Sequence, residues 1–187
     1  MKKSTVFLMA LMAAAPLRAK TYQIDPAHSS VGFKIRHIVG KVPGRFEKLE
    51  GSFDYEKDKP ETWTASAEID AASVNTNIVR RDDHLRSADF FDVAKCPKIS
   101  FKSTKADGKG SAGTITGDLT MHCVTKPVTL NVEFSDEVKG LRGDMILGAS
   151  AHGTVDRKEF GILGGPAGGM IGGEVAIDIE LEAPAKK

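Results

Sequence analysis

Apolar and polar residues alternate in eight short runs of this chain between Val31 and Leu181. A period of two places successive side chains on opposite faces of a β-strand. Turn-forming stretches separate several runs, such as Asp-Gly-Lys-Gly at 107–110, so neighbouring runs should pair as hairpins. Eight strands can close on themselves and thereby lose their exposed edges. The pattern predicts an all-β fold, an eight-stranded antiparallel barrel with an apolar interior.

The inward faces of these runs carry both large and small side chains. The predicted strands are residues 31–36, 49–56, 63–70, 99–101, 115–121, 128–134, 145–155 and 175–181. Their inward positions hold the aromatic residues Phe33, Phe53, Trp63 and Phe101 and the small residues Ala65, Ala67, Gly117, Ala149, Ala151 and Gly153. A barrel of this size either is filled by side chains or holds one small ligand. The small residues favour a cavity; alternatively, they accommodate large neighbours in a filled barrel.

The N-terminus has the features of a secretory signal peptide. Lys2 and Lys3 precede an apolar stretch at 6–17, which is shorter than the ~20 residues of a membrane span, and Ala19 ends the segment. Residues 1–19 are the predicted signal peptide, with cleavage after Ala15 as the alternative, and 20–187 form one domain. No later run is long enough to span a membrane. We expect a periplasmic protein.

The charge balance excludes some partners. Removal of residues 1–19 takes away three of the 26 basic residues and no acid, which leaves 23 basic against 25 acidic side chains. A net charge near −2 argues against nucleic-acid binding and weakens the case for binding anionic membrane surfaces.

Two cysteines lie at the open end of one predicted hairpin, one on each strand. If residues 98–104 and 113–121 pair around a turn at Lys109, Cys96 and Cys123 lie within about one residue of each other across the hairpin. An oxidising compartment would allow a disulfide between them. The alternative is two free thiols.

The interval between the third and fourth predicted strands contains the densest group of charged and aromatic residues. Thr76 or Asn77 could cap a short helix, and Ile78 and Leu85 would share one of its faces. We expect this helix over one end of the barrel. Near the rim it would place Arg81, Asp82, His84 and Arg86, with Phe90 and Phe91 as an apolar plug.

Six segments carry a more specific pattern. They are residues 24–33 (IDPAHSSVGF), 35–37 (IRH), 44–46 (GRF), 81–101 (RDDHLRSADFFDVAKCPKISF), 117–134 (GDLTMHCVTKPVTLNVEF) and 151–161 (AHGTVDRKEFG). Their order and spacing resemble the YceI-like family, polyisoprenoid-binding proteins with a lipocalin-like barrel. Cys96 and Cys123 depart from the family pattern, in which an aromatic residue and a glycine are expected, and residues 163–173 are unusually glycine-rich. The cysteine departure favours a disulfide private to this protein.

The resemblance implies a carrier for a long isoprenoid, such as a polyprenyl phosphate or a quinone tail. The residues expected to line the apolar site are Phe33, Ile35, Phe53, Trp63, Phe90, Phe91, Phe101, Leu119, Met121 and Leu147. The candidates for headgroup contacts at the rim are Arg36, His37, Arg81, His84 and Arg86, because arginine and histidine can donate to phosphate or quinone oxygens. Alternatively, Arg81, Asp82 and Arg86 form an ion-pair network that holds the helix on the barrel.

Other functions find less support. The five histidines lack zinc-ligand spacing, and no Cys-x-x-Cys accompanies them, so no metal or cofactor is expected. A haem barrel with His37 as axial ligand is one alternative. An enzyme acting on the lipid through Arg81, His84 and Asp82 is another, although no nucleophile elbow or nucleotide-binding loop is present. We therefore expect a non-enzymatic protein, and a homodimer is left open.

Overall fold

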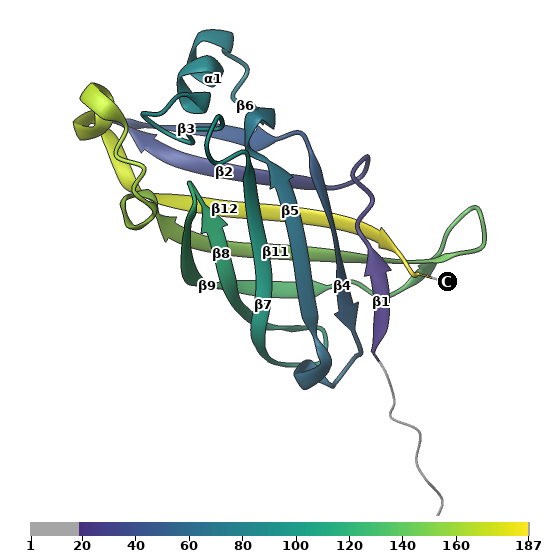
Figure 1. Cartoon of the computed structure of the whole chain (residues 1–187). Helices are drawn as coiled ribbons and strands as arrows, with labels where there is room; N and C mark the ends of the chain where they lie inside the picture. Colours follow the sequence, from purple (N-terminus) through teal and green to yellow (C-terminus); the bar gives the residue numbers. More distant parts are fainter. Residues whose placement is uncertain (1–18, 187) are drawn as a thin grey trace, which may run out of the picture.

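The structure is a computed structural model that describes residues 19–186. Its strands form one antiparallel sheet that curls into a half-barrel, with helix α1 (Val79–Arg86) over one end (Figure 1). The predicted all-β antiparallel class and the single short helix are confirmed. The predicted signal peptide, except for its last residue, lies outside the described residues.

All eight predicted strands are present. They are β2 (Ser30–His37), β4 (Leu49–Tyr55), β5 (Thr64–Asp70), β7 (Lys98–Lys109), β8 (Ala112–Met121), β9 (Val124–Phe134), β11 (Met145–Asp156) and β12 (Ile171–Pro184). Seven follow one another in the sheet as β4-β5-β7-β8-β9-β11-β12, and β2 lies beside β12. The meander inferred from alternation is therefore correct.

The predicted count of eight strands is wrong, because the sheet has 12. The additional strands are β1 (Lys20–Gln23), β3 (Gly40–Phe46), β6 (Val74–Asn75) and β10 (Val138–Lys139). Two glycines and Pro43 conceal the alternation of β3, which pairs with β2 along its length and with β6 at only two positions. A proline is tolerated on such an edge because few partners need its missing N–H. The other three strands are too short to show a period.

The end of the barrel away from α1, here called the far end, is closed by aromatic side chains. The rings of Tyr55 and Phe134 lie 4.1 Å apart, and Trp63 meets Phe134 at 5.0 Å. Trp63 is buried, and its indole N–H donates to the carbonyl of Glu56 at 2.8 Å. Phe53 joins the group at 5.8 Å from Phe134. These four residues form an aromatic plug that seals the far end, since buried aromatic pairs contribute both area and specific geometry.

The other end, here called the α1 end, is held together by links between loops. A disulfide joins Cys96 to Cys123, with Cα atoms 5.4 Å apart, so the segment after α1 is bonded to the β8–β9 turn. The β7–β8 turn lies at residues 110–111, slightly beyond the predicted Lys109, and the disulfide prediction is nevertheless confirmed. The ring of His122 is 2.9 Å from the carbonyl of Phe160 in the short helix η3 (Arg157–Phe160).

The start of α1 differs from the prediction. Ile78 occupies the N-cap position, and no side chain caps the helix, so neither Thr76 nor Asn77 plays that part. The side chain of Ile78 is 52% exposed, whereas Leu85 borders the barrel interior. The two residues therefore do not share one buried face. Two further short helices, η1 (Pro60–Thr62) and η2 (Ala71–Ser73), lie in loops, and η4 (Gly165–Met170) precedes β12.

Candidate ligand-binding cavity

The interior of the barrel contains a cavity of about 380 Å³. Its wall is almost entirely apolar and receives side chains from β2, β4, β5, β7, β8, β9, β11 and β12. Apolar cavities with a few polar groups at one side are the usual form of small-molecule sites, and this volume falls within their range. The predicted apolar cavity is confirmed.

The small inward residues divide between the two interpretations. Ala65, Ala67, Ala149 and Ala151 line the cavity and leave its space open. The two glycines instead accommodate neighbours: a Cβ atom on Gly117 would lie 2.5 Å from the ring of Phe101, and one on Gly153 would lie 2.7 Å from Leu130. The alanines therefore make the hollow, and the glycines allow its larger wall residues to pack.

Most of the residues expected in the apolar site lie on this wall. Those that line the cavity are Phe33, Ile35, Phe53, Phe90, Phe91, Phe101, Leu119 and Met121. Trp63 and Leu147 are not among the lining residues: Trp63 belongs to the aromatic plug, and Leu147 is buried elsewhere in the core. Alternation alone cannot separate a residue that lines the hollow from one that packs beyond its end.

The arginines and histidines of the wall gather at the α1 end, whereas its serines lie along the sheet. His37, Arg81 and His84 border the cavity, and both histidines are exposed. Arg36 and Arg86, the other two headgroup candidates, lie outside it. The guanidinium of Arg36 donates to the carbonyl of Ile38 at 2.9 Å, so it folds back over the β2–β3 turn.

The remaining arginine, Arg86, attaches α1 to the sheet. Its Nε donates to the carbonyl of Ala72 at 2.8 Å, its Nη2 to that of Val74 at 2.9 Å, and its Nη1 pairs with Asp83 at 3.0 Å. These contacts agree with the structural alternative for Arg86, although most of its acceptors are backbone carbonyls instead of the predicted carboxylate of Asp82.

Replacement of Arg86 by alanine should lower the free energy of unfolding by about 1–2 kcal/mol, because two carbonyls lose their donors. Bound lipid should be retained, since Arg86 does not border the cavity. Thermal melts and lipid extraction of the purified variant measure the two effects. Arg80→Ala, an exposed position on the same helix, is the control. A loss of lipid with unchanged melting would instead place Arg86 in the binding site.

The group Arg81, His84 and Asp82 is not assembled as an acid–base unit. Asp82 is buried and accepts from the backbone N–H and the hydroxyl of Thr76, at 2.8 and 2.5 Å. Arg81 donates to the same threonine, and His84 pairs with Asp89 at 3.1 Å. The three side chains therefore position the start of α1 and the loop after it.

One further residue at this end was missed from the sequence. Arg157 is only 3% exposed and borders the cavity. Its guanidinium donates to the carbonyls of Ile162, Gly168, Ile171 and Gly172, at 2.5 to 3.0 Å. Burial lowers the pKa of this guanidinium, and the charge of Asp156 partly opposes that shift. The only signal was its place in the family-like segment 151–161, where it follows a strand and breaks the apolar pattern.

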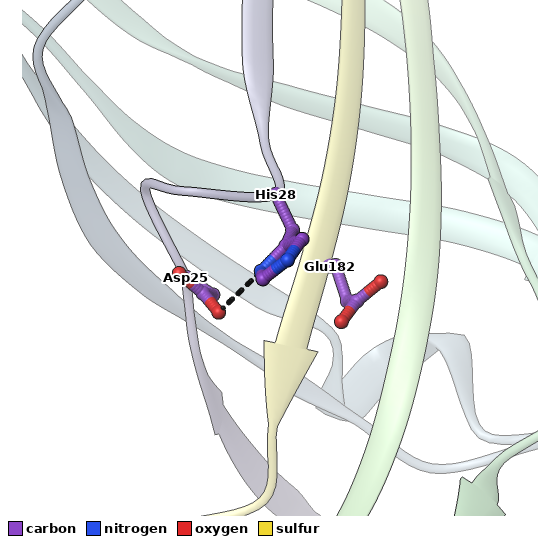
Figure 2. Close-up of side chains that lie close together, drawn as sticks. All are labelled: Asp25, His28 and Glu182. Atoms are coloured by element: carbon purple, nitrogen blue, oxygen red, sulfur yellow. Dashed lines mark hydrogen bonds and ion pairs between the residues drawn. The ribbon is translucent and has the colours of Figure 1, made fainter. Parts of the chain in front are cut away.

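At the far end, a turn between β1 and β2 is fixed to β12 (Figure 2). The backbone N–H of Asp25 donates to the carbonyl of Glu182 at 2.9 Å, and the amide of Glu182 donates to the hydroxyl of Ser29 at 3.1 Å. The ring of His28 lies 2.9 Å from a carboxylate oxygen of Asp25. That hydrogen bond raises the pKa of His28 and, together with the amide of Ala27, lowers the pKa of Asp25.

The His28–Asp25 pair should make the stability of the fold depend on pH. The contribution of His28 to the free energy of unfolding is complete below the ordinary histidine pKa of about 6.5. It is lost as the pH rises through the raised pKa of His28. The contribution of Asp25 is complete above the ordinary aspartate pKa of about 3.9 and is lost as the pH falls through its lowered value. Imidazole NMR titration should give a His28 pKa above the ordinary histidine value of about 6.5, and Asp25→Asn should lower it. An unchanged His28 pKa in Asp25→Asn would contradict the assigned cause.

Among residues 19–186, no helix has the length and apolarity needed to cross a membrane. Comparison with known proteins shows to which family the chain belongs. The model of the YceI-like domain matches residues 22–183. A UPF0312 protein of Pseudomonas savastanoi pv. phaseolicola is 36% identical over 195 residues, with 100% of both chains covered.

Two of the similar solved structures are informative. The YCEI protein of Campylobacter jejuni is 31% identical, with a TM-score of 0.73 over 89% of this chain and 98% of that one. A polyisoprenoid binding domain from Saccharophagus degradans, implicated in plant cell wall breakdown, shares the fold at 18% identity and a TM-score of 0.64, over 90% of this chain and 100% of that one. The family model covers nearly the whole described region, and the chain belongs to the YceI-like family.

Proposed function

We propose that the protein binds the long apolar chain of an isoprenoid lipid or quinone inside its barrel. The observation that carries this proposal is the apolar cavity of about 380 Å³, with its arginine and histidine side chains at one end. The fold shared with a polyisoprenoid binding domain supports the choice of ligand class.

The wall chemistry suits a hydrocarbon chain better than a polar metabolite. Each methylene group that leaves water contributes roughly 0.8 kcal/mol, so ten carbons contribute about 8 kcal/mol before ordering costs. An apolar wall discriminates poorly between chains of equal hydrophobicity. Selectivity must therefore come from the polar end.

The headgroup is proposed to lie at the α1 end, beside His37, Arg81 and His84. The buried charge of Arg157 adds a positive potential there, because its acceptors are backbone carbonyls. A phosphate or a quinone oxygen is complementary to this set of donors. Arg36 and Arg86 are left out of this headgroup site because they lie outside the cavity.

We further propose that the protein works in the periplasm as a carrier without catalysis, after removal of residues 1–19. Native mass spectrometry of the protein purified from the periplasm of its own host, followed by lipid extraction, tests the proposal. One prenyl lipid or quinone per chain is the expected result. Protein that emerges without lipid, and takes up none from a polyprenyl phosphate suspension, would refute it.

A further inference from the structure

The exposed apolar side chains of the barrel are concentrated at one end. Eight large apolar residues within 19–186 are more than half exposed. Six of them lie in α1, η4 and the loops of the α1 end: Ile38, Val39, Ile78, Val79, Leu163 and Met170. The other two lie at the far end, Val138 in β10 and Leu141 in the β10–β11 loop. Because scattered surface apolar residues are normal but clusters indicate contact sites, the α1 end is the candidate interaction surface.

The loops that carry these residues are joined to one another. The amide of Ile38, in the β2–β3 turn, donates to the carbonyl of Met170 at 2.9 Å. The amide of Gly164 donates to the carbonyl of Asp89, in the loop after α1, at 3.0 Å. Figure 1 shows η4, in yellow-green, beside the tip of the β2–β3 hairpin. The exposed side chains are therefore presented on one connected frame around the polar end of the cavity, here called the apolar rim.

The charges on this frame favour a negatively charged partner. The segment 161–173 contains no charged residue, and the β2–β3 turn at 36–41 contains Arg36 and Lys41 but no acid. Neither of these two, nor the exposed Arg80 beside Val79, forms an ion pair within residues 19–186. Two of the nearby acids pair with cations, Asp83 with Arg86 and Asp92 with Lys95, and Asp89 contacts the ring of His84. The rim therefore presents Arg36, Lys41 and Arg80 as cations that have no ion pair among the described residues, although the net charge of residues 20–187 is near −2.

We propose that the apolar rim docks the protein onto an anionic phospholipid membrane. Apolar side chains inserted at the headgroup boundary and cations beside anionic lipids are the two contributions that hold peripheral proteins at a bilayer. The orientation sets the polar end of the cavity against the membrane. The inference extends the proposed function, on which it rests for its purpose: a lipid ligand reaches the cavity from the membrane without crossing water.

Vesicle flotation with the purified protein tests the proposal. The variants are Val39→Asp and Leu163→Asp, whose side chains are 96% and 64% exposed, so the fold should be unaffected. The matched control is Leu141→Asp, at a fully exposed position of the far end. We expect the wild type and Leu141→Asp to bind phosphatidylglycerol–phosphatidylethanolamine vesicles. The two rim variants should bind at least about tenfold more weakly, and pure phosphatidylcholine should bind the wild type less well than the anionic mixture.

Three results would overturn the proposal that the apolar rim binds a membrane. They are no wild-type flotation, equal flotation of rim and control variants, and a wild-type dimer that only rim variants dissociate, which would make a second copy the occupant. Lipid content is measured separately by extraction from each variant. Rim variants that no longer float but retain lipid would confirm that the rim acts apart from the cavity. Flotation of a lipid-free wild type would contradict the proposed function but not the membrane-binding surface.

Discussion

Replacement of Arg157 by alanine is expected to lower the free energy of unfolding by about 3–5 kcal/mol, the largest stability effect of any single change proposed for this protein. The guanidinium holds four backbone carbonyls, all in the segment from Ile162 to Gly172. In the variant these carbonyls lose their donors in a buried setting, and an unsatisfied buried group costs about 1–3 kcal/mol. The segment between η3 and β12 should therefore become less ordered as the protein becomes less stable. Chemical denaturation measures the first effect, and amide hydrogen exchange in 162–172 measures the second.

Two further variants make this prediction specific. Arg157→Lys keeps the charge but offers fewer donors in a different geometry, so its stability should fall between those of the wild type and the alanine variant. Lys158→Ala, at the exposed neighbouring position, should change stability by less than about 0.5 kcal/mol. Equal stabilities of Arg157→Ala and Lys158→Ala would show that the carbonyls find other partners.

Alternation predicted the sheet well because a strand with one buried face must repeat every two residues. Strands such as β11 and β12, which pair over eleven positions, show this period clearly. The strands it missed give no such signal. β3 carries Pro43 on a sheet edge, where few ladder bonds constrain its sequence, and β6 and β10 have two residues each. Edges and short bridges depend on tertiary closure, which a local pattern does not record.

The polar residues of the site were harder to predict for a different reason. Arginine and histidine near a predicted rim were assigned to headgroup contact by residue type alone. The structure separates them by their acceptors: Arg86 is held by carbonyls of the η2–β6 connection, whereas His37 and His84 border the cavity. Arg157 went unnoticed because its acceptors come from a loop up to 15 residues away in sequence. Which acceptor a long side chain reaches is decided by the folded chain.

Replacement of Ala149 by phenylalanine is expected to weaken binding of a labelled polyprenyl phosphate by about 100-fold or more. Ala149 lines the cavity in the middle of the sheet, beside Leu181 and Phe134. A ring there occupies space that the lipid chain would fill, and exclusion of even four methylene groups costs about 3 kcal/mol, which is roughly a 100-fold change in affinity. Because the new ring enters an existing hollow, any loss of stability should stay within about 1–3 kcal/mol and leave the protein folded.

The matched control places the same ring on the outside of the same strand. His152 is exposed on the opposite face of β11, so His152→Phe should bind the lipid with wild-type affinity. A thermal melt of both variants shows whether each is folded. If Ala149→Phe is stable and binds as tightly as His152→Phe, the proposal that the lipid chain fills the barrel beside residue 149 is refuted.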